Sequence, residues 1–336
     1  MTSATENPMK SMYSRLRVLG LTKPFVRKTI LPDWWDDEVA TSPAGFAEAL
    51  VMISRYIGID PARLRDPEAD LALPTPTHVK FKRSRGSSAE DVSLAQNLAV
   101  QVMRHAMVGT PAAPKQLPTS ALDIRAQILD KGEAWVGLEG LLHFLWDHGV
   151  PVLHVANYPR SAKRMDGLAT RVGDRPGIVV SVGRKNSSWL LFVLAHELGH
   201  ICLGHVEANG VLTDANVDAD SEDDEEKAAN EFAVELLTGS ARRTWRATGT
   251  WPNARDLARY AIHHGRQHQI DPGHIALSYA NNKNFYPVAV AALKLIEPKP
   301  RGGRTIDDIM AERLDWSRLP EEASEFLMRM TQIERP

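Results

Sequence analysis

Residues 187–200 read Ser-Ser-Trp-Leu-Leu-Phe-Val-Leu-Ala-His-Glu-Leu-Gly-His, an apolar run that ends in an HExxH pattern. The apolar residues, with the two serines as N-caps, predict a buried helix over residues 189–203. Positions i and i+4 lie one turn apart on one helix face, so His196 and His200 can reach one metal ion together. Glu197 stands beside them, where a carboxylate can deprotonate an attacking water. The pattern predicts a zinc site for metal-assisted hydrolysis, with Glu197 as catalytic base.

A catalytic zinc site needs a third protein ligand, and the residues offer several candidates. His205 lies five residues after His200, one position short of the longer HExxHxxGxxH pattern, and beyond the expected helix end. A second helix is expected over residues 222–238, with Ser221 as its cap. An acidic run opens that helix, and such runs are usually solvated. Spacing alone does not decide which glutamate of this run would be the third ligand. The candidates are Glu222, Glu225 and Glu226.

Two further parts of such a site can be sought in the sequence. Asn230 shares a helix face with Glu226, so its amide can hydrogen-bond the outer nitrogen of a ligand histidine and fix the histidine tautomer. An oxyanion in the transition state needs a hydrogen-bond donor, but no single residue stands out. The candidates are Arg184, Tyr260, His263 and His264.

Residues 120–240 resemble the ImmA/IrrE family of zinc metallopeptidases, over about a third of the chain. The matching features are Gly149-Val150-Pro151-Val152, the run Ser188–His200, Leu203-Gly204-His205, and Glu226-x-x-Ala229-Asn230-x-Phe232-Ala233-x-Glu235-Leu236-Leu237. In that family the glutamate before the Ala-Asn pair is the third metal ligand, which implies Glu226 here. The resemblance also implies bound Zn²⁺ and a zincin-like α+β domain, mainly helical with a small sheet.

Members of this family commonly cleave a helix-turn-helix repressor, often one encoded beside them, in a stress, phage or mobile-element response. Others occur with DNA-binding domains in toxin–antitoxin-like modules. The resemblance therefore implies a site-specific zinc metallo-endopeptidase that acts on a repressor or antitoxin. The alternative is a DNA-binding antitoxin or transcription regulator that uses the peptidase-like fold for protein contacts. Bound zinc with cleavage of the neighbouring repressor would indicate the first, and operator binding that survives loss of His196 the second.

Patterning divides the chain into three regions: residues 1–110, 119–240 and 241–336. The first is expected to be helical, with a connector at 70–88, and it ends at a linker rich in proline. The second should hold helices near 120–130 and 136–148, followed by three short strands at 150–155, 167–172 and 178–182. The third is expected to be mostly helical, with helices near 254–268, 273–281, 287–296 and 305–314.

The N-terminal region leaves two interpretations open. It could be a degenerate helix-turn-helix that binds DNA, with Lys80, Lys82, Arg83 and Arg85 as phosphate contacts. The acidic block at residues 34–38 does not suit a phosphate face. A docking or regulatory domain is the other interpretation.

Bulk composition excludes several classes of protein. The chain has 336 residues, of which 43% are hydrophobic, and its formal net charge is -2. A net charge so close to zero does not indicate a nucleic acid or a membrane surface as partner. There is no run of about 18 apolar residues that would predict a membrane span. The single cysteine, Cys202, cannot form an internal disulfide and is expected to be buried and inert. We therefore expect a cytoplasmic protein without membrane contacts.

Overall fold

The computed structural model describes residues 7–74, 79–82, 89–111, 113–163, 165–181, 183, 185–214, 223–243, 245, 253–283 and 286–334. Among these residues, no helix has the length and hydropathy of a membrane span. The architecture is α+β and mainly helical, with one small sheet, which confirms the expected fold class.

A mixed sheet of five strands lies at the centre of the fold, in the order β1-β5-β3-β4-β2. The strands are β1 (Val79–Lys82), β2 (Val152–His154), β3 (Gly167–Val172), β4 (Arg175–Val180) and β5 (Val211–Asp214). Strand β3 is antiparallel to both β4 and β5, whereas β1 pairs with β5 and β2 pairs with β4 in parallel. All three expected strands are present. The expectation of a connector throughout residues 70–88 is wrong, because β1 lies within that range, and β5 was not expected.

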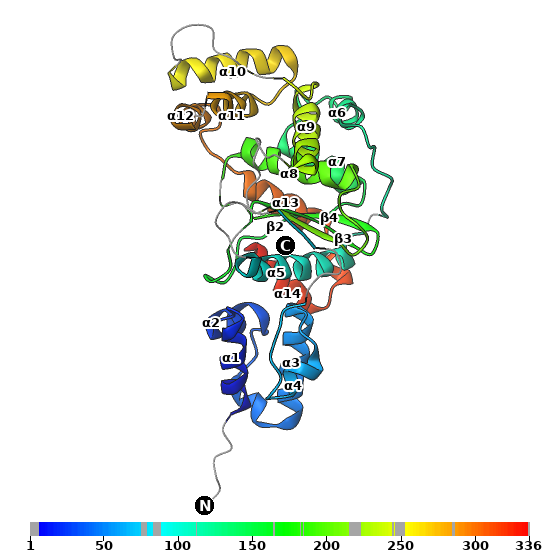
Figure 1. Ribbon diagram of the computed structural model, residues 1–336, viewed down its shortest axis with the longest axis vertical. Helices are drawn as coiled ribbons and strands as arrows, with labels where there is room; N and C mark the ends of the chain where they lie inside the picture. Colours follow the sequence, from blue (N-terminus) through cyan, green and yellow to red (C-terminus); the bar gives the residue numbers. More distant parts are fainter. Residues whose placement is uncertain are drawn as a thin grey trace, which may run out of the picture.

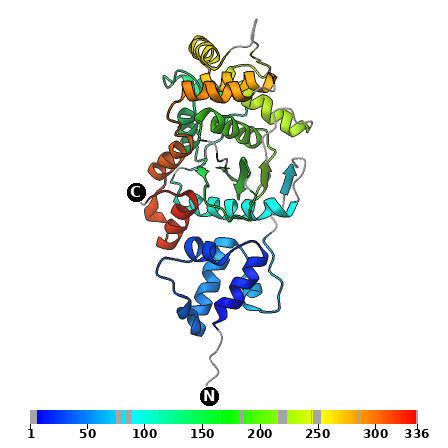
Figure 2. The same ribbon diagram turned by 90° about the vertical axis from the view of Figure 1, so that its left-hand side faces the viewer.

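Helices cover both faces of this sheet, as Figures 1 and 2 show from two sides. Helix α8 (Ser187–Cys202) packs on one face of β3 and β4, and α5 (Ala89–Gly109) packs on the other. Helix α9 (Asp224–Thr238) packs along α8, and α6 (Ala121–Leu129) and α7 (Leu138–Asp147) flank this pair. The sheet residues between these layers are apolar and buried, including Leu168, Ala169, Ile178, Val179 and Val180. The sheet therefore supplies a rigid floor for α8.

The N-terminal segment forms a helical lobe below the sheet in Figure 1. Its elements are α1 (Pro8–Val18), α2 (Lys23–Phe25), η1 (Val26–Ile30), η2 (Asp37–Thr41), α3 (Pro43–Ile57) and α4 (Pro61–Arg65). The carboxylate of Asp37 ties this lobe together by accepting hydrogen bonds from Tyr13, Lys23 and Arg27 at 2.6, 2.8 and 2.8 Å. The acidic block expected at residues 34–38 thus contains a carboxylate that has an internal structural role.

The C-terminal segment forms one end of the molecule and then returns to its middle (Figure 1). Three helices pack together beyond α8 and α9: α10 (Ala254–His268), α11 (Pro272–Lys283) and α12 (Tyr286–Ile296). The chain then returns to the sheet and the N-terminal lobe through α13 (Gly302–Arg313), the turn η3 (Trp316–Arg318) and α14 (Glu321–Thr331). All four expected helices are present within a few residues, and α14 is an additional one.

One hydrophobic core contains residues from all three expected regions, from Met9 to Met330, and smaller cores lie among α10–α12. Strand β1 and helix α5 come from residues 1–110 but complete the sheet and one of its faces. The division at residues 110 and 240 stays a proposal.

Candidate metal centre

Helix α8 carries the HExxH residues and is buried along most of its length. It starts at Ser187, and its N-cap is Asn186, whose side chain accepts a hydrogen bond from the Ser188 amide. The expected serine caps are therefore wrong by one position. Ser187 instead bonds Glu297, which follows α12: the carboxylate accepts from the Ser187 hydroxyl at 2.6 Å and amide at 2.9 Å. An acidic group suits the positive end of a helix dipole, so Glu297 stabilises the start of α8.

Three side chains from α8 and α9 converge on one point. The Nε2 atoms of His196 and His200 lie 3.0 Å apart. Each also lies 3.3 Å from a carboxylate oxygen of Glu226. Ligand atoms that bind zinc tetrahedrally at 2.0–2.2 Å are separated from one another by about 3.3–3.6 Å, and the three separations here lie at or slightly below that range. The three donors therefore fit a zinc-sized ion, and they form the one such group found among the described residues.

Close packing of α8 against α9 brings Glu226 to the histidines. A Cβ atom at Gly199 would lie 3.1–3.3 Å from the backbone of Ala229 and the side chain of Phe232, so glycine permits this approach. Helix α9 is capped by Asp223, which accepts hydrogen bonds from the Glu225 and Glu226 amides. The expected cap, Ser221, and the rival ligand Glu222 lie outside the described residues. The other rival, Glu225, is not among the converging side chains.

Hydrogen bonds at the outer nitrogens orient both imidazoles. Asn230 Oδ1 lies 3.0 Å from His196 Nδ1, in the position expected from its spacing. His205 Nδ1 lies 2.8 Å from His200 Nδ1, because the chain turns back at Gly204, where φ is positive. His205 was considered as a metal ligand, but in the structure it lies against the outer nitrogen of His200 and is not one of the three converging side chains. The sequence signal for this role was its place at the turn that ends α8.

The side chain of Glu197 is fully buried between α8 and the start of β3. Gly167 opens that strand, and a Cβ atom there would overlap the Glu197 carboxylate. Glycine is therefore needed at this position for strand and carboxylate to approach. Cys202 lies at the far end of α8, where burial raises the pKa of its thiol to about 12. Such a thiol is unreactive at neutral pH, in line with the expectation.

The three oxyanion candidates that the structure describes are not among the converging side chains of this centre. Tyr260, His263 and His264 lie on α10, where their rings contact one another and Tyr260 and His264 also contact Trp245. Arg184 lies outside the described residues. His274 was not predicted from the sequence. It is a buried residue of α11 that lines a pocket of about 170 Å³ between α8, α9 and α11.

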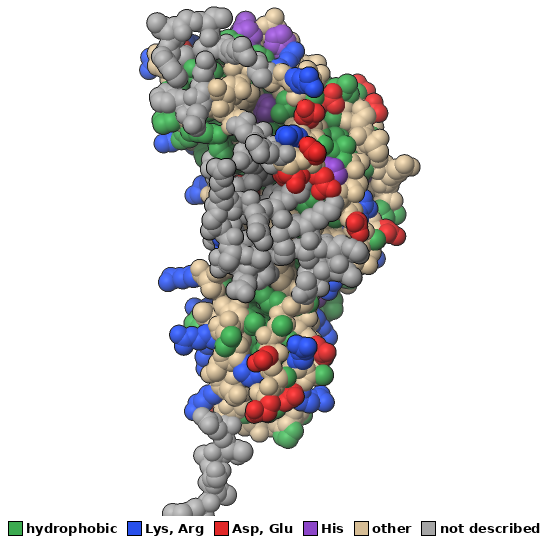
Figure 3. Space-filling view, viewed as in Figure 1, with side chains coloured by type: hydrophobic (Ala, Val, Ile, Leu, Met, Phe, Trp, Pro, Cys, Tyr) green, Lys and Arg blue, Asp and Glu red, His purple; other side chains and the backbone are tan. Residues whose placement is uncertain are grey.

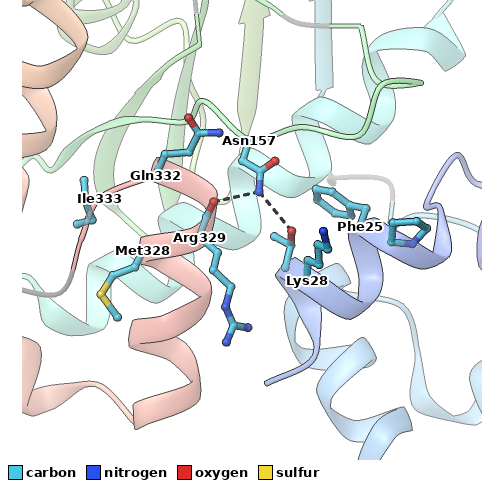
Figure 4. Close-up of a pocket in the computed structure, with 9 residues that line it drawn as sticks. Phe25, Lys28, Asn157, Met328, Arg329, Gln332 and Ile333 are labelled. Carbon is cyan, nitrogen blue, oxygen red and sulfur yellow. Dashed lines mark hydrogen bonds between the residues drawn. The ribbon is translucent and has the colours of Figure 1, made fainter. Parts of the chain in front are cut away.

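A larger groove of about 490 Å³ lies elsewhere, between the N-terminal lobe and α14. Figure 4 shows Asn157 at its wall, where the amide donates to Thr29 Oγ1 at 3.2 Å and to the Arg329 carbonyl at 3.0 Å. None of its lining residues comes from α8 or α9, so we do not assign this groove to the metal centre.

The segment that carries these residues matches one known protein family. Residues 147–249 match the model of the peptidase M78 family, described as the IrrE N-terminal-like domain. No curated protein and no solved structure matches the chain. The matched segment contains His196, Glu197, His200 and Glu226, and it confirms the resemblance drawn from the sequence.

Proposed function

We propose, from the membership of residues 147–249 in the IrrE N-terminal-like peptidase family, that the protein is a zinc-dependent endopeptidase. One observation above all supports this proposal. His196 Nε2, His200 Nε2 and the carboxylate oxygens of Glu226 converge, with separations of 3.0–3.3 Å. Two imidazoles and one carboxylate are a common ligand set of catalytic zinc, and they leave a fourth position for water or substrate.

The chain's own residues would divide the chemistry as follows. His196, His200 and Glu226 would hold the ion, while Asn230 and His205 would keep the imidazoles in the binding tautomer. Bound zinc supplies a Lewis acid that polarises the scissile carbonyl and makes water more acidic. Glu197 would take the proton from the attacking water and deliver it to the leaving amine. Its burial beside β3 would keep bulk water away from that proton.

The proposed substrate is a helix-turn-helix repressor or an antitoxin, cleaved at one site in a stress, phage or mobile-element response. The family resemblance supports this substrate class. The single cysteine supports a location in the cytoplasm, the compartment in which a transcriptional regulator would be available as substrate.

The test is incubation with helix-turn-helix proteins from the same organism, beginning with any encoded beside the gene, followed by mass spectrometry of the fragments. Wild type should produce two defined fragments, and Glu197→Gln should cleave at least about 100-fold more slowly while keeping its zinc. Glu231→Gln, an exposed glutamate on α9, is the matched control and should cleave as wild type does. Unchanged cleavage by Glu197→Gln would falsify the assigned role.

The alternative, a DNA-binding regulator, has less support. On the face of the N-terminal lobe seen in Figure 3, basic and acidic side chains are interspersed. Lys80 and Lys82 belong to β1, which pairs with β5, and Arg83 and Arg85 lie outside the described residues. Operator binding that persists in His196→Ala would favour this alternative.

A further inference from the structure

The pocket beside the metal centre has an apolar wall made by three helices and by the residue that opens α12. Its apolar lining residues are Trp189, Phe192 and Val193 of α8, Val234 of α9, Leu277 of α11 and Tyr286 of α12. Trp189, Phe192, Val234 and Leu277 are partly exposed, and Tyr286 is 37% exposed. Apolar side chains that stay partly exposed in a concave site mark a place where a ligand can bury them.

This pocket continues the helix faces that build the metal centre. Phe192 precedes His196 by one helical turn, and Val193 precedes Glu197 by one turn, a rise of about 6 Å along α8. On α9, Val234 follows Asn230 by one turn. Asp166, also in the lining, directly precedes the glycine that lies against the Glu197 carboxylate. A group bound in the pocket is therefore a near neighbour of the proposed catalytic base.

Size and polarity define what the pocket can hold. A cavity of about 150 Å³ lined by aliphatic and aromatic side chains is large enough for benzene, and this pocket measures about 170 Å³. His274 lies in its wall with its ring stacked on Phe192 at a centroid distance of 6.0 Å. Burial lowers the pKa of His274 to about 4, so its imidazole is neutral at pH 7. Asp166, Ser278 and Asn281 also line the pocket, so polar groups form part of its wall. The six apolar side chains and the neutral imidazole form the rest, a surface on which an uncharged ring can be buried.

We propose that this pocket is a specificity site that receives a large apolar side chain, aromatic rings above all, from a substrate residue next to the scissile bond. This inference rests on the proposed peptidase function and adds the class of residue that the peptidase would select. Helix α11, which supplies Leu277 and His274, lies beyond the family-matched segment 147–249. The other wall of the pocket, from Asp166 to Val234, lies inside that segment, so α11 and α12 complete a pocket that the matched segment begins.

The wall formed by α11 is fixed against α8. Asp271, just before α11, accepts a hydrogen bond from the His274 amide at 2.8 Å and also bonds Ser188. A Cβ atom at Gly273 would overlap the Ser188 side chain, so the two helices touch at this point. A pocket held in this way is formed before substrate arrives, which lowers the entropy cost of binding.

Paired hydroxamates test the pocket separately from the metal. The zinc-loaded protein would be titrated by calorimetry with two hydroxamates that differ only in carrying a benzyl or a methyl group. The benzyl compound should bind at least about tenfold more tightly, because its ring is buried in the pocket. In Leu277→Trp, which fills the pocket, this preference should fall below about twofold while the affinity of the methyl compound is retained.

The control is Val290→Trp, a substitution at an exposed position of α12 outside the pocket lining, which should keep the full preference. If Leu277→Trp does not fold, as judged by circular dichroism, Ser278→Phe at the pocket wall replaces it. Equal binding of the two hydroxamates by wild type would overturn the specificity site and leave the peptidase proposal intact. Failure of the zinc-loaded protein to bind either compound would overturn both.

Discussion

His205 Nδ1 lies 2.8 Å from Nδ1 of His200, the ring nitrogen opposite the one that faces Glu226. If His200 Nδ1 carries the proton and donates it to His205, the lone pair on Nε2 is left for a metal. Outer partners of this kind typically change metal affinity by 10–100-fold. They do so without contacting the ion.

Substitution of His205 should therefore weaken zinc binding without eliminating the site. We expect His205→Ala to lower zinc affinity about 10–100-fold, whereas His200→Ala should abolish binding of the ion at this site. Competition for zinc against a chromophoric chelator measures the zinc affinity of both variants. Complete loss of binding in His205→Ala would show that this residue is itself a ligand, as its spacing had left open.

Loss of the Glu297 carboxylate should destabilise the N-terminus of helix α8, which carries His196 and His200. Glu297 accepts hydrogen bonds from the Asn186 side chain and from the Ser187 amide and hydroxyl, at 2.6–2.9 Å. We expect Glu297→Ala to lower the free energy of unfolding by about 2 kcal/mol in urea denaturation. Glu312→Ala, at an exposed position, should change it by less than about 0.5 kcal/mol. Equal effects in the two variants would contradict the capping role.

Loss of Arg125 should lower the free energy of unfolding more than loss of Glu297 does, because Arg125 is a buried charge with four carbonyl partners. Its guanidinium donates to the carbonyls of Leu236 and Leu237 at the end of α9 and of His268 and Gln269 at the end of α10. Arg125→Met leaves these acceptors without donors, so we expect a loss of about 3 kcal/mol in the free energy of unfolding. Hydrogen exchange should show the loss at the ends of α9 and α10. Exchange that is unaltered there would contradict this role.

Asp37 should make the stability of the N-terminal lobe depend on pH. Burial alone would raise the pKa of this carboxyl, but hydrogen bonds from Lys23, Tyr13 and Arg27 outweigh burial and lower it to about 2. A depressed folded-state pKa stabilises the protein above the unfolded value near 4, and this contribution is lost as pH falls from about 4 to 2.

The measurement is urea denaturation of metal-free wild type and Asp37→Asn at several pH values. At pH 7 the variant should be less stable by about 1–2 kcal/mol, after allowance for partial solvent screening. This difference should shrink between pH 4 and pH 3. A difference that is the same at pH 7 and pH 3 would show that ionisation of Asp37 does not contribute.

Local sequence predicted the elements whose signals are complete within one segment. The apolar run before His196 and the acidic start of α9 were enough to place both helices within three residues at either end. Strands β1 and β5 were missed because each is only four residues long, and their pairing joins segments far apart in the chain. His274 was missed for a similar reason. Nothing near it in sequence indicates that α11 packs against α8.

The central claim is that His196, His200 and Glu226 together hold one divalent ion. Its most direct test is the metal content of purified protein after zinc loading and gel filtration, measured by mass spectrometry for wild type, Glu226→Gln and the matched control Glu225→Gln. We predict about one zinc per chain in wild type and in Glu225→Gln, and a large loss in Glu226→Gln. Full zinc content in Glu226→Gln, or no zinc in wild type, would contradict the account.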